Sequence, residues 1–333
     1  MDELIKTLVE AYGPSGFEDE IRRIIHDIVS PYADDISVDS MGNLIVLKKG
    51  DGSGLSVMIA AHMDEIGIMV THITEKGFLR FTNIGGLRPQ TLMGSRVQFS
   101  DGTIGVIYCE KLEAWNKMHG QDKHYIDVGA TSKENCPVQV GSAAGFVNPF
   151  VDLGGRYVSK SMDDRIGCVI GIETLRRMSL RETSPHDIYY VFSVQEEVGT
   201  RGAQTAANAL NVDVGIAIDV TMTGDTPEAP TMAVDLGAGP AIKVKDSGMI
   251  SHAGLVRLMR TRAEDGGIPY QLEVLERGST DARSIQIAGA GCAAGCISIP
   301  SRYVHTQSEM VDAGDVENSV QLLAEILSNP IKL

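Results

Sequence analysis

The sequence predicts an α/β protein that carries an inserted all-β domain. Helical and strand-like patterns alternate over residues 2–70 and again from 159 to 333, which is typical of helices packed on a sheet. Short β-prone runs separated by glycine turns replace this alternation over residues 71–158. Because 333 residues exceed the size at which one hydrophobic core stops growing, we expect two domains, residues 1–70 plus 159–333 and residues 71–158.

Two helices lead the chain in this prediction. Residues 2–12 have helical periodicity, and Ser15 followed three places later by Glu18 resembles a capping box at the start of a second helix. A hairpin and a strand that ends at His62 follow, over residues 36–39, 43–47 and 57–61.

The insert and the C-terminal half differ in the spacing of their strands. Runs such as 78–81, 96–99 and 104–108 are short and closely spaced, so they favour a small β-barrel or sandwich. Longer helical patterns then return. We expect helices near 163–178, 200–210, 251–264, 281–288 and 313–328, and strands ending at Glu197 and lying near 213–219, 240–245, 271–276 and 293–300.

Composition excludes several classes of partner and location. Acidic residues outnumber basic ones, 44 against 29, so with a formal charge of −15 nucleic acid and anionic lipid are poor partners. No uncharged apolar run reaches the roughly 18 residues of a membrane span, and the N-terminus does not resemble a signal peptide. Five cysteines without a CxxC pair are not typical of a disulfide scaffold, so we expect a soluble protein of the reducing cytoplasm.

Two adjacent acids, Glu196 and Glu197, carry the strongest functional signal. They close the apolar run 188–194 and are followed closely by Gly199. Two carboxylates at the end of a buried strand are costly unless something compensates their charge. A bound metal is the natural compensator, and consecutive residues of a strand can serve one site only where the strand breaks, for which Gly199 is placed.

Candidate partners for this pair follow other strand-like segments. His62 and Asp64 follow residues 57–61, Asp219 follows residues 214–218, and His305 follows residues 297–300. Because strand ends converge at one edge of an α/β sheet, these side chains are expected to meet there. A further acidic pair, Asp163-Asp164, opens a helix. Imidazole and carboxylate together suit zinc, cobalt or manganese.

Each signal has a plain structural alternative. Glu196-Glu197 alone could be a solvated strand end, Asp163-Asp164 could be stabilising acids at a helix N-terminus, and Asp219 could begin a turn. The junction 279–283 is either a helix cap or part of a substrate pocket, and the loop that holds Trp115 is either an interface or simple loop packing. Only the joint pattern favours a metal site.

Taken together, the motifs resemble the M42 family of dinuclear metalloaminopeptidases. The resemblance spans nearly the whole chain and includes the order of the motifs and the β insert between the first two. The motifs are His62-Met63-Asp64-Glu65-Ile66-Gly67, Met162-Asp163-Asp164-Arg165-Ile166-Gly167, Gln195-Glu196-Glu197-Val198-Gly199, Asp219 and Tyr303-Val304-His305-Thr306.

The resemblance implies a fold and a set of residue roles. The catalytic domain would be a three-layer α/β/α structure with a mixed sheet, similar to zinc exopeptidases, and the insert a small β-barrel. Two divalent ions per subunit, zinc or cobalt, would share Asp163, one held by His62 and Asp219 and the other by Glu197 and His305. Glu196 would be the general base, Asp64 would orient the His62 ring, and the Asp163–Asp164 peptide bond would be cis.

The activity implied is removal of N-terminal residues from short peptides by attack of a dimetal-bound hydroxide. The β insert would join subunits into dimers and then into tetrahedral dodecamers with enclosed active sites. Two alternatives stay open, a glycoside hydrolase that uses Glu196 and Asp64 as its carboxylate pair, and a metal-binding protein without catalysis. Neither the preferred N-terminal residue nor the physiological metal follows from the sequence.

Overall fold

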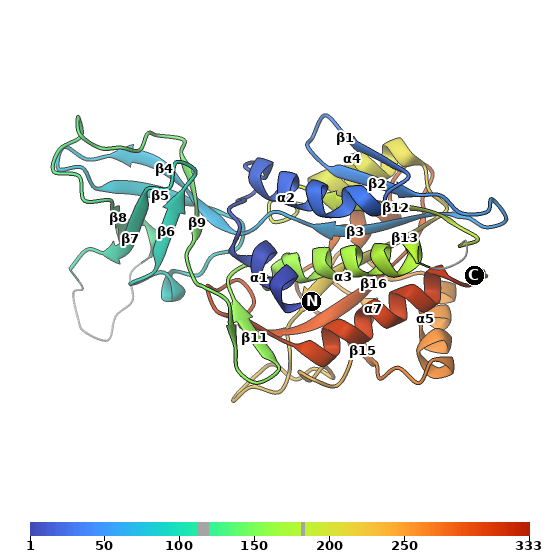
Figure 1. Ribbon diagram of the computed structural model, residues 1–333. Helices are drawn as coiled ribbons and strands as arrows, with labels where there is room; N and C mark the ends of the chain where they lie inside the picture. Colours follow the sequence, from blue (N-terminus) through green and yellow to red (C-terminus); the bar gives the residue numbers. More distant parts are fainter. Residues whose placement is uncertain (112–119, 181–183) are drawn as a thin grey trace.

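The chain folds into a helix-covered mixed sheet and a separate closed β-barrel, which form the two lobes of Figure 1. The computed structural model describes residues 1–111, 120–180 and 184–333. The predicted α/β class with an inserted barrel is confirmed. The loop that holds Trp115 lies outside the described residues.

The large sheet has eleven strands, of which the central four, β3, β12, β13 and β16, run parallel to one another. Their carboxyl ends therefore meet at one edge of the sheet. The hairpin β1–β2 flanks β12, while β17, β11 and β10 extend the other side and β14–β15 branch from β16. The strands are β1 Asp35–Val38, β2 Leu44–Lys48, β3 Ser56–His62, β10 Val151–Asp152, β11 Arg156–Ser159, β12 Asp187–Ser193, β13 Val214–Thr221, β14 Ala241–Lys245, β15 Gln271–Val274, β16 Ala293–Arg302 and β17 Glu309–Asp312.

Helices cover both faces of this sheet, because successive strand residues point to opposite faces and both sets are apolar. In β3, Val57 and Ile59 join one core cluster, and Met58 and Ala60 join the other. The first cluster includes α1 Asp2–Glu10, α2 Asp19–Val29, α3 Met162–Ser179, α5 Ala253–Asp265 and α7 Ala313–Leu327, and the second includes α4 Arg201–Leu210 and α6 Asp281–Gln286. The predicted three-layer arrangement is thus confirmed.

The second face is lined by small residues, which lets its helices approach closely. Gly215 of β13 shows this most clearly, since an added Cβ there would lie 2.2 Å from the side chain of Ile285 in α6. The start of α6 lies at the edge where the parallel strands end, since Ser193 at the end of β12 donates to Asp281.

The inserted β domain is a closed six-stranded barrel, which decides between the two predicted architectures. Strands β6 and β7 alternate in burial, and in β7 Ile104, Val106 and Tyr108 face outward. The order around the barrel is β4-β5-β8-β7-β6-β9, with β4 Gly67–Ile73, β5 Leu79–Ile84, β6 Arg96–Phe99, β7 Ile104–Cys109, β8 His124–Asp127 and β9 Ala143–Phe146. Short 3-10 helices lie at Ser30–Tyr32, Pro89–Thr91 and Gln121–Lys123.

The strand pairing places the barrel over slightly different residues than the predicted insert of 71–158. Its first strand begins at Gly67, and its last ends at Phe146. Strand β11 pairs with β17 of the large sheet, so residues 151–159 extend that sheet instead. Short β-prone runs look alike in sequence whichever sheet they join, because the partner strand lies far along the chain.

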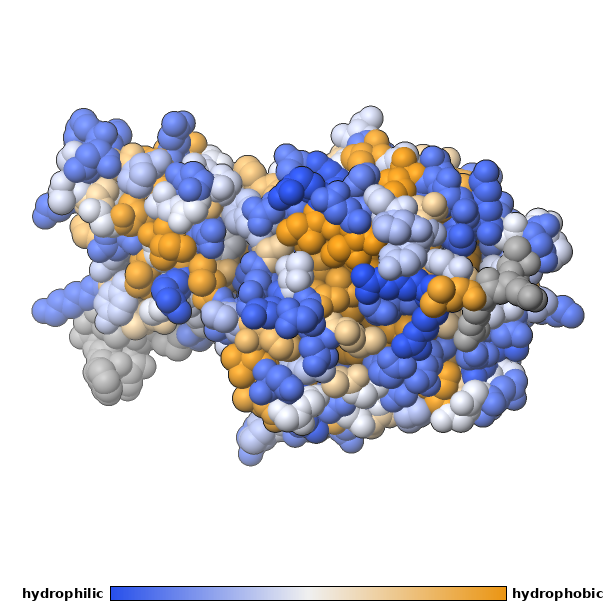
Figure 2. All heavy atoms as spheres, viewed as in Figure 1, coloured by the Kyte–Doolittle hydropathy of each residue, from blue (hydrophilic) through white to orange (hydrophobic). Residues whose placement is uncertain are grey.

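Both lobes show a surface on which polar and apolar residues are mixed (Figure 2). Among the described residues, no helix is long and apolar enough to cross a membrane. All five cysteines are free thiols.

Candidate metal centre

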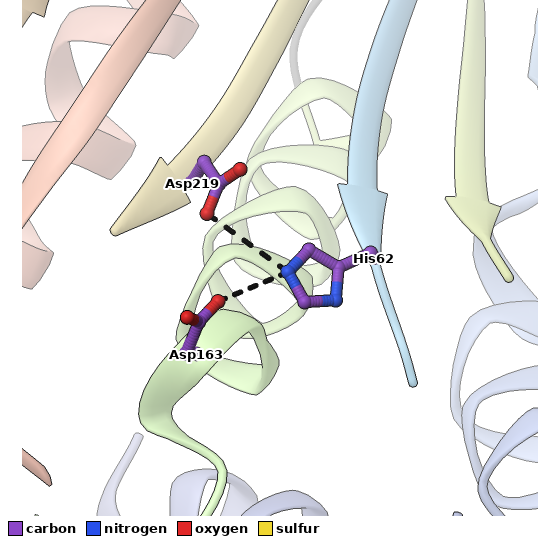
Figure 3. Close-up of side chains that lie close together, drawn as sticks. All are labelled: His62, Asp163 and Asp219. Atoms are coloured by element: carbon purple, nitrogen blue, oxygen red, sulfur yellow. Dashed lines mark hydrogen bonds and ion pairs between the residues drawn. The ribbon is translucent and has the colours of Figure 1, made fainter. Parts of the chain in front are cut away.

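The predicted ligands converge at the edge where the parallel strands end. His62 is the last residue of β3, Asp219 lies near the end of the neighbouring β13, and Asp163 lies at the start of α3. Figure 3 shows the three side chains pointing toward one another. His62 Nε2 lies 3.0 Å from Asp163 Oδ1 and 3.9 Å from Asp219 Oδ1.

A second group lies against the other side of the same aspartate. His305 Nε2 is 3.3 Å from Asp163 Oδ2 and 3.2 Å from Glu197 Oε2. Each oxygen of Asp163 therefore faces a different histidine. Within each of the two triads, one ligand atom per residue lies within 4.8 Å of the others, which is the spacing of groups that can hold an ion.

Burial and charge shift the pKa of every member of this cluster. Burial by itself lowers the pKa of His62, but hydrogen bonds to Asp163 and Asp64 outweigh it and hold that pKa well above its usual value. For His305, burial likewise acts downward, and the charges of Glu197 and Asp163 raise the pKa to about 12. An ion that binds here must displace these protons, so its affinity rises with pH.

Burial acts on the pKa of the carboxylates in the opposite direction, upward. Burial, followed by the repulsion of nearby acids, raises the pKa of Asp219 and Glu196 well above the ordinary value and raises that of Glu197 as well. Burial also acts upward on Asp163, but its two histidine partners hold its pKa below the usual range. So many buried acids at one place repel one another unless cations join them.

The donor set fits divalent metal ions. It offers one imidazole and one terminal carboxylate on each side of a shared carboxylate, a combination that zinc and similar ions accept. Glu197 Oε1 is buried and has no hydrogen-bond partner among the described residues. An unpartnered buried oxygen on a carboxylate beside His305 is the feature that a bound cation would satisfy.

Asp64 connects His62 to the loop that carries Glu196 and Glu197. Its carbonyl oxygen lies 3.1 Å from His62 Nδ1, which leaves Nε2 facing the other ligands. Its carboxylate accepts hydrogen bonds from the backbone N–H groups of Glu196 and Glu197 at 3.0 and 3.2 Å. Ser15 donates to the same carboxylate at 2.5 Å.

This last contact corrects the predicted capping box. Helix α2 begins at Asp19 with Glu18 at its N-cap position and without a side-chain cap, so Ser15 does not cap it. The hydroxyl of Ser15 instead finds a buried charged acceptor, which is the stronger partner.

The strand before Glu196-Glu197 also ends earlier than predicted. Strand β12 stops at Ser193, and Gln195 takes a left-handed conformation with φ of 55°. The break thus precedes the acids, and Gly199, with φ of 120°, lies beyond them in the same loop. Glu196 Oε2 consequently faces the centre and lies 3.9 Å from His62 Nε2.

The two aspartates at the start of α3, Asp163 and Asp164, make different contacts. Asp163 faces the histidines, while Asp164 turns away and accepts from the backbone N–H groups of His62 at 3.3 Å and Gly167 at 3.0 Å. Both have non-helical backbone angles, and the peptide bond between them is cis, as the resemblance implied.

Two further buried acids lie at the site: Glu309, which was not recognised in the sequence, and Asp281 of the junction 279–283, for which a helix cap and a substrate pocket were the alternatives. Glu309 accepts from the backbone N–H groups of Asp163 and His305. Asp281 accepts from Ser193 at 2.5 Å, its Oδ1 has no partner among the described residues, and burial raises its pKa to about 6. The adjacent Thr280 is the N-cap of α6, as the structural alternative predicted. For Glu309, the only signal was an acid at the start of a short β-prone run.

Comparison with known proteins agrees with this geometry. The family model described as M42 glutamyl aminopeptidase matches residues 42–322. A lysyl aminopeptidase of Pyrococcus furiosus is 37% identical over 98% of this chain and 96% of its own. The solved aminopeptidase of Desulfurococcus kamchatkensis is 40% identical with a TM-score of 0.92, covering 98% of this chain and 94% of its own.

A third similar protein forms large assemblies of its subunits. The Pyrococcus horikoshii TET1 peptidase, which can assemble into a tetrahedron or a large octahedral shell, is 33% identical with a TM-score of 0.89 and 98% coverage of both chains. With the family model matched over most of its length, the chain belongs to the M42 peptidase family and is a hydrolase of peptide bonds.

Proposed function

We propose that the protein is a dinuclear metalloaminopeptidase that removes N-terminal residues from short peptides. One observation carries the proposal: the two oxygens of Asp163 each face a different histidine, so one carboxylate is shared between two triads. His62 and Asp219 would complete one site, and Glu197 and His305 the other. Zinc and cobalt both suit these donors.

The bound ions would supply Lewis-acid chemistry, activating water and polarising the scissile carbonyl. The remaining tasks fall to the chain. Asp64 fixes the ring of His62 so that Nε2 faces the site, and it ties the loop of Glu196 and Glu197 to the end of β3. A carboxylate in such a position orients the groups that do the chemistry.

Glu196 is proposed as the general base. Its Oε2 lies 3.9 Å from His62 Nε2, beside the proposed ligands without being one of them, so it would face a water activated at the site. Burial raises its pKa well above the ordinary value, which favours holding a proton taken from water and passing it to the departing amine.

The barrel is proposed as the assembly domain. Ile104, Val106 and Tyr108 project from one strand onto its outer face, and an exposed apolar row is typical of a surface that another subunit covers. By analogy with the TET1 peptidase, we propose dimers that build a tetrahedral dodecamer, whose interior admits short peptides and excludes folded proteins. Five free thiols, three of them buried, favour a cytoplasmic location.

The first test is release of free amino acids from a panel of short peptides and aminoacyl amides. Activity should disappear on chelation and return with added zinc or cobalt, and N-acetylated copies of the same peptides should stay intact because they lack the free amine. The panel would also reveal the preferred N-terminal residue.

Cellulose oligomers serve as the matched control. Cleavage of sugar that ignores the chelator, with no peptide trimmed, would support the carboxylate-only glycosidase alternative. Two bound ions without turnover on any substrate would support the non-catalytic one.

A further inference from the structure

Glu309 contacts both halves of the candidate centre without being one of its ligands. It is the first residue of β17 and is 1% exposed. Its Oε2 accepts from the backbone N–H of Asp163 at 2.9 Å, and its Oε1 accepts from the backbone N–H of His305 at 2.8 Å. One buried carboxylate therefore joins two ligand-bearing segments that lie more than a hundred residues apart.

The ligands differ in how firmly regular structure holds them. Asp219 sits within β13, paired with Ser298 of β16, and His62 is paired with Ser193 in the β3–β12 ladder. Backbone hydrogen bonds between strands fix both of these positions. His62 also has a carboxylate acceptor of its own, because its backbone N–H donates to Asp164 at 3.3 Å, and neither residue contacts Glu309 through its backbone.

Asp163 and His305 lack this support. Asp163 has non-helical backbone angles at the start of α3, and His305 has a left-handed φ of 61° in a loop where Tyr303 also reaches 63°. Residues other than glycine adopt the left-handed backbone region rarely, and they stay there when surrounding contacts hold them. The carboxylate of Glu309 supplies an acceptor at both places.

We propose that Glu309 is a positioning residue that sets the affinity of the Asp163–Glu197–His305 site for its ion. The proposal rests on the proposed dinuclear function. The carboxylate of Glu309 accepts a hydrogen bond from the backbone N–H of His305, just as the carboxylate of Asp64 accepts from those of Glu196 and Glu197. Because His62 and Asp219 are held by the sheet, the Asp163–His62–Asp219 site should depend on Glu309 much less.

The test compares Glu309→Gln with a matched control, Asp315→Asn. Asp315 is also 1% exposed, and its two oxygens accept from the backbone N–H groups of Gly237 and Gly239 at 2.8 and 2.7 Å. It is thus a buried acid that ties a loop together without contacting a ligand. A merely structural role for Glu309 would make the two variants behave alike.

The readouts are ions bound per subunit and the dissociation constant of each ion, measured with zinc or cobalt against a competing chelator. Thermal unfolding of the metal-free proteins is recorded alongside. In Glu309→Gln, we expect the ion of the Asp163–Glu197–His305 site to bind about 10- to 100-fold more weakly, while the affinity of the other site changes little. His305→Ala should weaken the same site to a larger extent. Asp315→Asn should keep both affinities.

Unchanged affinities in Glu309→Gln, or equal loss of both ions, would overturn the proposal. A wild-type protein that binds no ion would overturn the dinuclear function as well, so the two failures are distinguishable. If Glu309→Gln does not fold, Glu309→Asp takes its place, because it keeps the charge and shortens the reach by one methylene.

Discussion

The strands of the large sheet and of the barrel are both rich in apolar residues, but they differ in how many of their faces are buried. Strand β13 of the sheet is buried at all eight positions, because helices cover both of its faces. Strand β7 of the barrel alternates between exposed and buried residues, because only its inner face is covered. The barrel thus has an outward surface that the central sheet lacks.

Because of this difference, we expect the catalytic groups at the edge of the large sheet and the assembly surface on the barrel. An unpaired charged group is costly along a strand that is buried on both faces, and most charged groups of the candidate centre lie where the parallel strands end. The loop that follows β5 of the barrel approaches the centre closely, since an added Cβ at Gly86 would lie 2.6 Å from Nδ1 of His305. We therefore expect substitutions at the sheet edge to affect catalysis and those on the barrel surface to affect assembly.

The largest effect is expected at the sheet edge. Glu196→Gln should keep both ions and lower turnover about 100- to 10,000-fold, because it removes the proton acceptor and leaves the ligands intact. His62→Ala, its matched control, should lose metal and activity together. Peptide cleavage and metal content are measured on the same preparations. Metal loss in Glu196→Gln would mean that the roles of Glu196 and Glu197 are reversed.

A smaller effect on stability is expected from Asp281→Asn in the metal-free protein. Burial raises the pKa of Asp281 from 3.8 to about 6, so its contribution to stability is fully present below pH 3.8 and is lost as the pH rises through 6. The neutral variant avoids the cost of a buried charge, and should be more stable than the wild type at pH 8 by up to about 3 kcal/mol.

Denaturant unfolding at pH 4 and pH 8 checks this sign. The advantage of Asp281→Asn should shrink toward zero at pH 4, where the wild-type carboxyl is largely protonated too. An equal difference at both pH values would contradict the assignment of the effect to the buried charge.

The smallest change in subunit stability is expected on the barrel. Val106→Lys places a charge in the exposed apolar row, and should reduce the mass of the assembly in light scattering while changing the stability of the subunit by no more than about 0.5 kcal/mol. The matched control is Val38→Lys, which makes the same change at an exposed valine of the large sheet. Equal loss of assembly in both variants would argue against a special role for the barrel.

The order and type of the elements could be predicted from local patterns. Helical periodicity and short apolar runs report burial over a few neighbouring residues, so the helices near 163–178 and 313–328 and the strands near 213–219 and 293–300 lie within a few residues of their predicted positions. The pattern also predicted that acids and histidines gather at the ends of these elements, whereas the choice of five candidate ligands among them rested on the resemblance to the M42 family.

Contacts between distant segments could not be predicted in this way. Glu309 bonds to Asp163 across 146 residues and Ser15 to Asp64 across 49, and neither side chain differs in local pattern from a surface acid or a helix cap. The early end of β12 has the same origin, since the backbone N–H groups that follow it donate to the distant side chains of Asn43, Glu18 and Asp64. Periodicity encodes what each segment buries, whereas hydrogen-bond partners depend on which segments the folded chain brings together.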